Sequence, residues 1–147
     1  MTTLKTVAIY GGTFNPIHLG HTSLAQAICD TGVVDEVWFM VSPLNPLKID
    51  TSKIILPTDT RIRMARMAVK DNNCLNVSDF ETKLPIPSYT INTLTELKKA
   101  FPHKIFSLLV GEDNWQRFSQ WYHADEIKVN HDIIVYGRNY NQNDDVL

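Results

Sequence analysis

Five short apolar runs alternate with segments of helical periodicity, and this alternation limits the chain to a small set of folds. All except the third run are nearly continuous apolar sequences, which is typical of parallel strands covered on both faces. A sheet of this kind needs helices on each side. The runs are rich in β-branched residues and predict strands at Thr6–Tyr10, Glu36–Val41, Leu75–Phe80, Lys104–Val110 and Asp132–Gly137.

The segments between the strands carry the spacing of helices. Pro16 suits the entry to the first of them, because a proline lacks the N–H that this position leaves unpaired. Strand–helix alternation favours right-handed crossovers, and therefore a doubly wound, Rossmann-like α/β fold with a parallel sheet of about five strands flanked by helices. At 147 residues and without internal repeats, the chain is expected to form one domain, 1–147. Helices are predicted at His18–Asp30, from Ser88 or Thr90 to Phe101 and, in broken form, at Asp113–Lys128. A further helix, capped by Thr58 or Asp59, is predicted to run to about Lys70.

Composition and charge point away from several classes of protein. The formal net charge is -2, so bulk electrostatics do not favour a nucleic-acid or membrane-surface binder. The two cysteines, Cys29 and Cys74, are far apart and fit a reducing compartment rather than a disulfide scaffold. The N-terminal segment lacks the pattern of a signal peptide and no transmembrane stretch is present, so a cytoplasmic location is expected. Whether the chain forms a homo-oligomer is left open.

The most informative stretch follows the first predicted strand and reads YGGTFNPIHLGH. Gly11 and Gly12 allow backbone N–H groups to approach a ligand closely, at the position where nucleotide-binding α/β folds bind phosphate. His18 and His21 are three residues apart, so they lie on one face near the start of the next helix, which favours anion binding. A plain turn, surface histidines or a metal site are alternatives for the separate pieces, but their combination favours a polyphosphate site.

The pattern G-G-T-F-N-P-x-H-x-G-H resembles the signature of the nucleotidyltransferase superfamily that shares the H-x-G-H motif, and it is similar to that of bacterial nicotinate-nucleotide adenylyltransferases. The resemblance implies a reaction in which ATP and nicotinate mononucleotide give deamido-NAD and pyrophosphate, with Mg2+. It assigns catalytic roles to His18 and His21 and phosphate contacts to Gly12, Thr13 and Phe14. No set of metal-ligating residues is predicted in the chain itself.

Two further stretches carry the resemblance on the acceptor side. PSYTINTL is similar to the family pattern S-Y-T-x-x-T-L and assigns the Thr90 backbone amide to the nicotinate carboxylate. GEDNWQRFSQWYHADEI resembles G-x-D-x-x-x-x-F-x-x-W. Trp121 is then the expected stacking platform for the nicotinate ring, with the Tyr122 amide beside it. Two neighbouring aromatic residues, Trp115 and Phe118, are expected to pack in the core.

The remaining matches lie on the ATP side. Gly111 and Asp113 open the same stretch, where a glycine allows close approach and a carboxylate can accept hydrogen bonds from ribose hydroxyls. SPLNPLK resembles the family's proline-rich loop, which ends in P-H-K or P-H-R. Lys48 is therefore expected to neutralise triphosphate charge as a third catalytic residue, whereas Leu47 replaces the usual histidine. Arg138 follows the fifth predicted strand and matches a family arginine near the phosphates.

The resemblance ends before a segment that family members normally contain. An I-S-S-T-x-I-R stretch, which supplies phosphate contacts in relatives, is not found in these 147 residues, so the domain is expected to be truncated at its C-terminal end. Two alternatives therefore stay open. One is a nucleotide-binding fragment with little turnover, and the other is an adenylyltransferase for another phosphate acceptor such as phosphopantetheine. The choice of nicotinate over nicotinamide mononucleotide rests on the resemblance.

Overall fold

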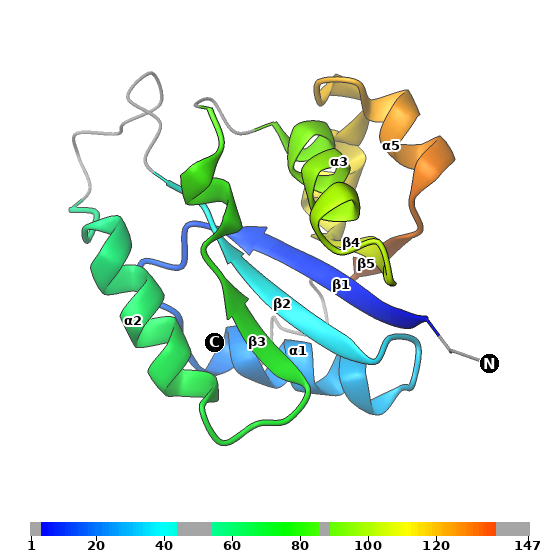
Figure 1. Ribbon diagram of the computed structural model, residues 1–147. Helices are drawn as coiled ribbons and strands as arrows, with labels where there is room; N and C mark the ends of the chain where they lie inside the picture. Colours follow the sequence, from blue (N-terminus) through cyan, green and yellow to red (C-terminus); the bar gives the residue numbers. More distant parts are fainter. Residues whose placement is uncertain (1–3, 44–53, 86–88, 138–147) are drawn as a thin grey trace.

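The strands form one parallel sheet, as the alternating pattern predicts. The structure is a computed structural model and describes residues 4–43, 54–85 and 89–137. Neighbouring strands are all parallel, in the order β3-β2-β1-β4-β5 (Figure 1), which confirms the doubly wound α/β prediction. The strands are β1 (Lys5–Gly12), β2 (Glu36–Val41), β3 (Leu75–Ser78), β4 (Lys104–Gly111) and β5 (Ile133–Tyr136).

The helices occupy the predicted segments, although the ends of several helices and strands differ by one or two residues. Phe80 begins a 3-10 turn rather than ending the third strand, and its N–H donates to Ser78 Oγ at 3.1 Å. The second helix has Pro57 at its N-cap position, so the prediction that Thr58 or Asp59 caps it is wrong. The helices are α1 (Leu19–Asp30), α2 (Thr58–Val69), α3 (Thr90–Ala100), α4 (Glu112–Gln116) and α5 (Ala124–Asn130), with 3-10 turns η2 (Phe80–Lys83) and η3 (Phe118–Gln120).

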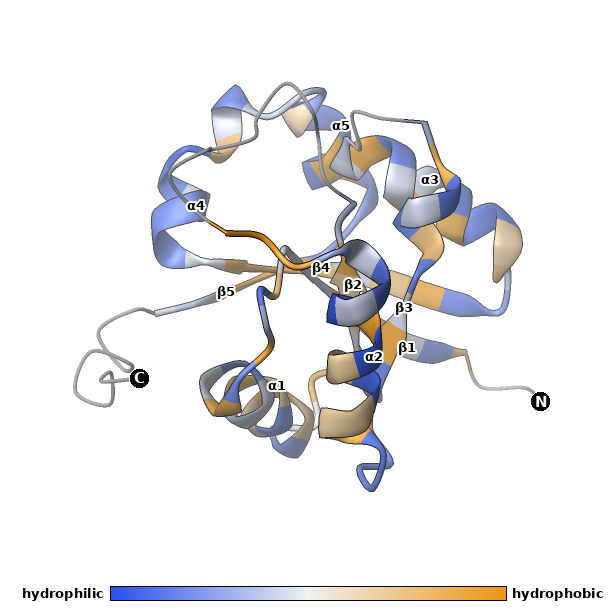
Figure 2. Cartoon of the chain, turned by 90° about the vertical axis from the view of Figure 1, so that its left-hand side faces the viewer, coloured by the Kyte–Doolittle hydropathy of each residue, from blue (hydrophilic) through white to orange (hydrophobic). Residues whose placement is uncertain are grey.

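Two apolar layers separate the sheet from its helices. Figure 2 shows α1 and α2 on one side of the sheet and α3 and α5 on the other. Because successive side chains of a strand point to opposite faces, β1 contributes Ala8 and Tyr10 to the first layer and Val7 and Ile9 to the second. The edge strand β5 is only partly covered, with Val135 39% exposed, so the expectation of burial on both faces holds for the central strands alone.

The strand order has a topological switch point between β1 and β4. The chain leaves β1 toward β2 and leaves β4 toward β5, although β1 and β4 are neighbours. The connections therefore diverge beyond the carboxyl ends of β1 and β4, and ligands bind at such a switch point in open α/β sheets. Gly12 ends β1 and Gly111 ends β4, so these two predicted site residues lie at the switch point.

The described part of the chain has no helix that combines the length and the apolar character needed to cross a membrane.

Candidate active site

The turn after β1 is shaped by Phe14. This residue is buried and has a positive φ of 47°, which places its ring back over the end of the strand. A Cβ at Gly12 would lie 3.2 Å from that ring, so packing inside the turn requires the glycine. Space beside Gly11 is open, since nothing lies within 4 Å of the Cβ it lacks. Close approach of a ligand is thus better supported at Gly11 than at Gly12.

Asn15 connects the same turn to the segment that precedes α2. Its Nδ2 donates to the carbonyl of Ile54 at 2.9 Å, and the N–H of Leu56 donates to its Oδ1 at 2.8 Å. Pro16 follows in a cis peptide bond and stands before the helix, which begins at Leu19. The expectation that Pro16 forms the helix entry is therefore wrong, because His18 occupies the N-cap position.

His18 and His21 cap α1 together. The N–H of Gly20 donates to His18 Nδ1 at 3.0 Å, and the N–H of His18 donates to His21 Nδ1 at 3.1 Å. The arrangement is a reciprocal capping box in which imidazole nitrogens replace the usual oxygen acceptors. The two rings stack with centroids 3.8 Å apart and planes inclined by 22°.

The capping contacts also fix which ring nitrogen carries the proton. Because Nδ1 of both rings accepts a backbone N–H, the N–H of each imidazole is at Nε2. His21 is held further by Phe14, whose ring meets it edge-on at 4.9 Å. Two N–H donors on stacked rings at the N-terminus of a helix are suited to bind phosphate oxygens.

Acid should destabilise the protein through His21. Burial, and secondly the proximity of His18, lower its pKa from 6.5 to about 4. The unfolded chain therefore binds this proton more readily than the folded chain, so the stabilisation is complete above about pH 6.5 and is lost as the pH falls toward 4. We expect a loss of about 1–2 kcal/mol after allowance for partial exposure. Denaturant unfolding of the unmodified chain and of His21→Asn, which does not titrate, measures it at pH 7 and 4.5. Equal acid losses in both would contradict the assignment.

Arg61 is a buried residue that the sequence analysis missed. Its side chain is fully buried, and it donates to the carbonyls of Thr13 at 2.7 Å, Ser42 at 2.8 Å and Leu56 at 2.9 Å. A fourth hydrogen bond reaches Thr58 Oγ1 at 2.9 Å. Burial lowers the pKa of this guanidinium from its usual value. Arg61 thus connects the turn after β1, the residue that follows β2 and the start of α2.

At the end of β4, Gly111 is needed because other groups already fill the space beside it. A Cβ there would lie 3.1 Å from the ring of Tyr136 and 3.2 Å from Asp113 Oδ1. Asp113 lies in the first turn of α4 and its side chain turns back toward the strand end. The structure therefore places Gly111 and Asp113 side by side at the carboxyl end of β4, whereas their predicted contacts with ATP stay a prediction.

The two stretches predicted to bind the acceptor meet through their aromatic residues. Tyr89, the N-cap of α3, packs against Tyr122 with ring centroids 4.4 Å apart. Thr90 is the first residue of α3, and Tyr89 forms no side-chain cap hydrogen bond to the helix. Trp121 is half-buried against Phe118 at 4.8 Å. Thr90, Trp121 and Tyr122 therefore belong to one region of the surface.

The prediction that Trp115 and Phe118 both belong to the core is only half right. Phe118 is buried in the layer between the sheet and α3. Trp115 is 36% exposed and lies near Lys128, whose Nζ is 5.5 Å from its ring centroid. Lys48, Leu47 and Arg138 lie outside the described residues, so their predicted roles stay predictions.

Comparison with known proteins adds a decisive observation. The model of the cytidylyltransferase-like family matches residues 9–146. A protein of Bacteroides thetaiotaomicron named probable nicotinate-nucleotide adenylyltransferase is 44% identical over 135 residues, 92% of this chain. A Flavobacterium johnsoniae protein of the same name is 41% identical over 132 residues and is covered over 67% of its length. The chain belongs to the nicotinate-nucleotide adenylyltransferases of the cytidylyltransferase-like family.

Solved structures support the fold of this adenylyltransferase family. Plasmodium falciparum nicotinic acid mononucleotide adenylyltransferase complexed with NaAD superposes with a TM-score of 0.75 at 19% identity, over 92% of this chain and 66% of that one. The same enzyme complexed with APC gives a TM-score of 0.73 at 18% identity. The chain spans 65% of the Bacteroides thetaiotaomicron protein and 64% of a Bacteroides fragilis relative.

Proposed function

We propose that the chain transfers the adenylyl group of ATP to nicotinate mononucleotide, giving deamido-NAD and pyrophosphate. The observation that carries the proposal is the stacked pair His18 and His21, whose capping contacts leave an Nε2–H donor on each ring at the helix N-terminus. Its position beside the switch point of the sheet suits a polyphosphate. The names of relatives at 41–44% identity supply the acceptor.

On the ATP side, the turn after β1 would bind the phosphates. The proposed contacts are the amides of Gly12, Thr13 and Phe14, with the hydroxyl of Thr13, which is exposed. Gly111 and Asp113 at the end of β4 would meet the adenosine ribose. Lys48 and Arg138 would supply further positive charge to the phosphates.

On the acceptor side, the N-terminus of α3 would bind the nicotinate carboxylate. The amide of Thr90 lies in the first turn, where helix N–H groups lack intrahelical acceptors. The half-buried indole of Trp121 would stack on the pyridine ring, and the amide of Tyr122 would lie beside it. The contact between Tyr89 and Tyr122 supports this grouping because it joins the two stretches.

The reaction is an in-line attack by the acceptor phosphate on the α-phosphorus of ATP. The phosphate nucleophile is already ionised at neutral pH, so the reaction needs no general base. The residues have to orient two anions and neutralise the charge that develops between them. Nε2–H donors from His18 and His21 would act at this point, and the low pKa of His21 keeps the ring of that residue uncharged near pH 7.

Mg2+ would enter with ATP rather than reside in the protein. Among residues 4–43, 54–85 and 89–137, no group of three or more His, Cys, Asp or Glu side chains could hold a metal ion. This fits Mg2+, which is commonly held by substrate phosphates with one or two carboxylates. The ion would screen triphosphate charge.

A pyrophosphate-release assay tests the proposal directly. The chain, ATP and Mg2+ are combined with nicotinate mononucleotide, nicotinamide mononucleotide or phosphopantetheine, and we expect the highest kcat/KM with the first. Turnover with phosphopantetheine alone would replace the proposed acceptor. Calorimetric binding of ATP without turnover on any acceptor would instead identify a nucleotide-binding fragment.

A further inference from the structure

A buried carboxylate lies between the two sides of the proposed site and has no role in the chemistry described above. Glu81, in the turn η2, is 8% exposed. Its Oε1 accepts from Ser42 Oγ at 3.0 Å and its Oε2 accepts from Thr93 Oγ1 at 2.8 Å. Burial raises the pKa of this carboxyl, while the two hydroxyl donors oppose that rise. Glu81 therefore joins the segment after β2 to α3.

Ser42 continues the connection to the turn after β1, residues 12–14, which is the proposed phosphate turn. Its N–H donates to the carbonyl of Gly12 at 2.9 Å, and its own carbonyl accepts from Arg61 at 2.8 Å. Arg61 also binds the carbonyl of Thr13 at 2.7 Å. The backbone of the turn is thus held at two successive residues by groups that meet at Ser42.

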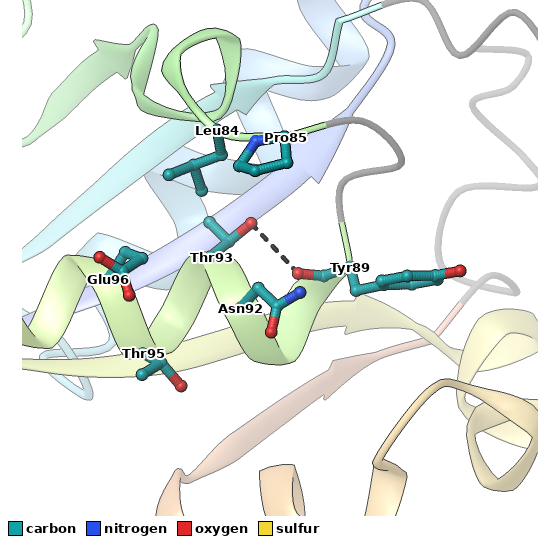
Figure 3. Close-up of a pocket in the computed structure, with 7 residues that line it drawn as sticks. All are labelled: Leu84, Pro85, Tyr89, Asn92, Thr93, Thr95 and Glu96. Atoms are coloured by element: carbon teal, nitrogen blue, oxygen red, sulfur yellow. Dashed lines mark hydrogen bonds between the residues drawn. The ribbon is translucent and has the colours of Figure 1, made fainter.

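Thr93 anchors the other end of the connection in the acceptor helix. It is 1% exposed and stands three residues after Thr90. Figure 3 shows Thr93 on the side of α3 toward Leu84, whereas Thr95 points away from it. The pocket drawn there, about 300 Å³, is lined by none of the predicted site residues that the structure describes. The role of Thr93 lies in its hydrogen bond to Glu81 rather than in that pocket.

We propose that Glu81 is a positioning residue. The series of hydrogen bonds Gly12–Ser42–Glu81–Thr93 fixes the N-terminus of α3 relative to the phosphate turn, and so sets the distance between acceptor phosphate and ATP. The proposal rests on the proposed function for the identity of the two substrates. Three hydrogen bonds span from the turn to the helix, with no exposed side chain among them. An in-line transfer is sensitive to this distance, because a misplacement of about 1 Å can cost about 10²-fold in rate.

The test removes one hydroxyl from the connection. Thr93→Val has nearly the same shape and lacks the hydroxyl, which donates to Glu81 Oε2 at 2.8 Å and makes a longer contact of 3.4 Å with the carbonyl of Tyr89 (Figure 3). Thr95→Val removes a hydroxyl that donates to the carbonyl of Ile91, two residues along the same helix, and serves as the control. We expect Thr93→Val to lower kcat by about tenfold or more, with the calorimetric Kd for ATP within about twofold of the unmodified chain. Thr95→Val should leave both unchanged.

Variants of Glu81 separate positioning from support of the fold. Glu81→Gln retains an acceptor and a donor to which the two hydroxyls can reorient, so its kcat should stay within about threefold of the unmodified chain. Glu81→Ala breaks both hydrogen bonds, so its kcat should fall at least as far as that of Thr93→Val. A kcat unchanged in Thr93→Val would overturn the proposal. A rise in the Kd for ATP that matches the fall in kcat would overturn it too, because the defect would then lie within one subsite.

A readout without turnover keeps the inference separate from the proposed function. Hydrogen exchange of the backbone amides at 12–14 reports how firmly the phosphate turn is held. We expect faster exchange there in Thr93→Val than in Thr95→Val, even with no substrate present. Equal exchange rates in Thr93→Val and Thr95→Val would reject the connection. If exchange is faster in Thr93→Val but the unmodified chain shows no adenylyl transfer, only the proposed function is rejected.

Discussion

Replacing His21 by alanine is expected to lower kcat for adenylyl transfer by about 10²-fold or more, the loss that follows removal of one donor to a developing oxyanion. The substitution removes the Nε2–H donor and also the Nδ1 acceptor of the His18 N–H. Steady-state rates with saturating ATP, Mg2+ and nicotinate mononucleotide measure the effect. Activity within about threefold of the unmodified chain would exclude the catalytic role.

His21→Asn separates the donor from the cap. An asparagine Oδ1 reaches about as far as Nδ1 and can still accept from the His18 N–H, so the start of α1 should be preserved. The amide cannot reach as far as Nε2, however, so the phosphate donor is lost. We therefore expect an asparagine variant with nearly normal thermal stability and a kcat as low as that of His21→Ala. Recovery of activity in His21→Asn would show that capping alone explains the residue.

The local pattern of apolar residues was sufficient to predict most of the strands and helices. The strand Glu36–Val41 was predicted to the residue, because a strand buried on both faces leaves a continuous apolar signal. The start of α3 at Thr90 was also one of the two predicted. The prediction missed the end of β3 at Ser78, since Phe80 is apolar in either conformation and only the Ser78 hydroxyl bond marks the turn.

Residues that hold the site together were harder to predict than those proposed to act in it. Glu81 accepts hydrogen bonds from Ser42 and Thr93, which are 39 and 12 residues away in the sequence. No local sequence pattern predicts contacts between residues so far apart. His18 was predicted on the helix but not as its cap, because histidine is uncommon there. Arg61 did leave a signal: it stands four residues before Ala65 and eight before Val69, in the buried stripe of α2. A charged side chain on such a stripe indicates a buried polar contact.

Removing the Arg61 side chain is expected to destabilise the protein more than any other single change considered. In Arg61→Ala the carbonyls of Thr13, Ser42 and Leu56 lose a part-buried hydrogen bond from the guanidinium, and a cavity remains where the buried side chain stood. A hydrogen bond that involves a charged group contributes about 1.5–3 kcal/mol, so the loss of three such bonds should lower the free energy of unfolding by at least about 3 kcal/mol. Thermal unfolding should show a midpoint lower by about 10 °C.

Two matched variants show whether the hydrogen bonds are the cause. Arg66→Ala, on the same helix, removes an exposed ion pair with Asp79 at 3.7 Å and should cost less than about 0.5 kcal/mol. Arg61→Met keeps most of the side-chain volume without a donor, so it should remain about 2 kcal/mol or more below the unmodified chain. Within the described part of the chain, Arg61 has no carboxylate partner, so its removal leaves no opposite charge buried. A methionine variant as stable as the unmodified chain would therefore mean that packing, and not the unpaired carbonyls, makes this position sensitive.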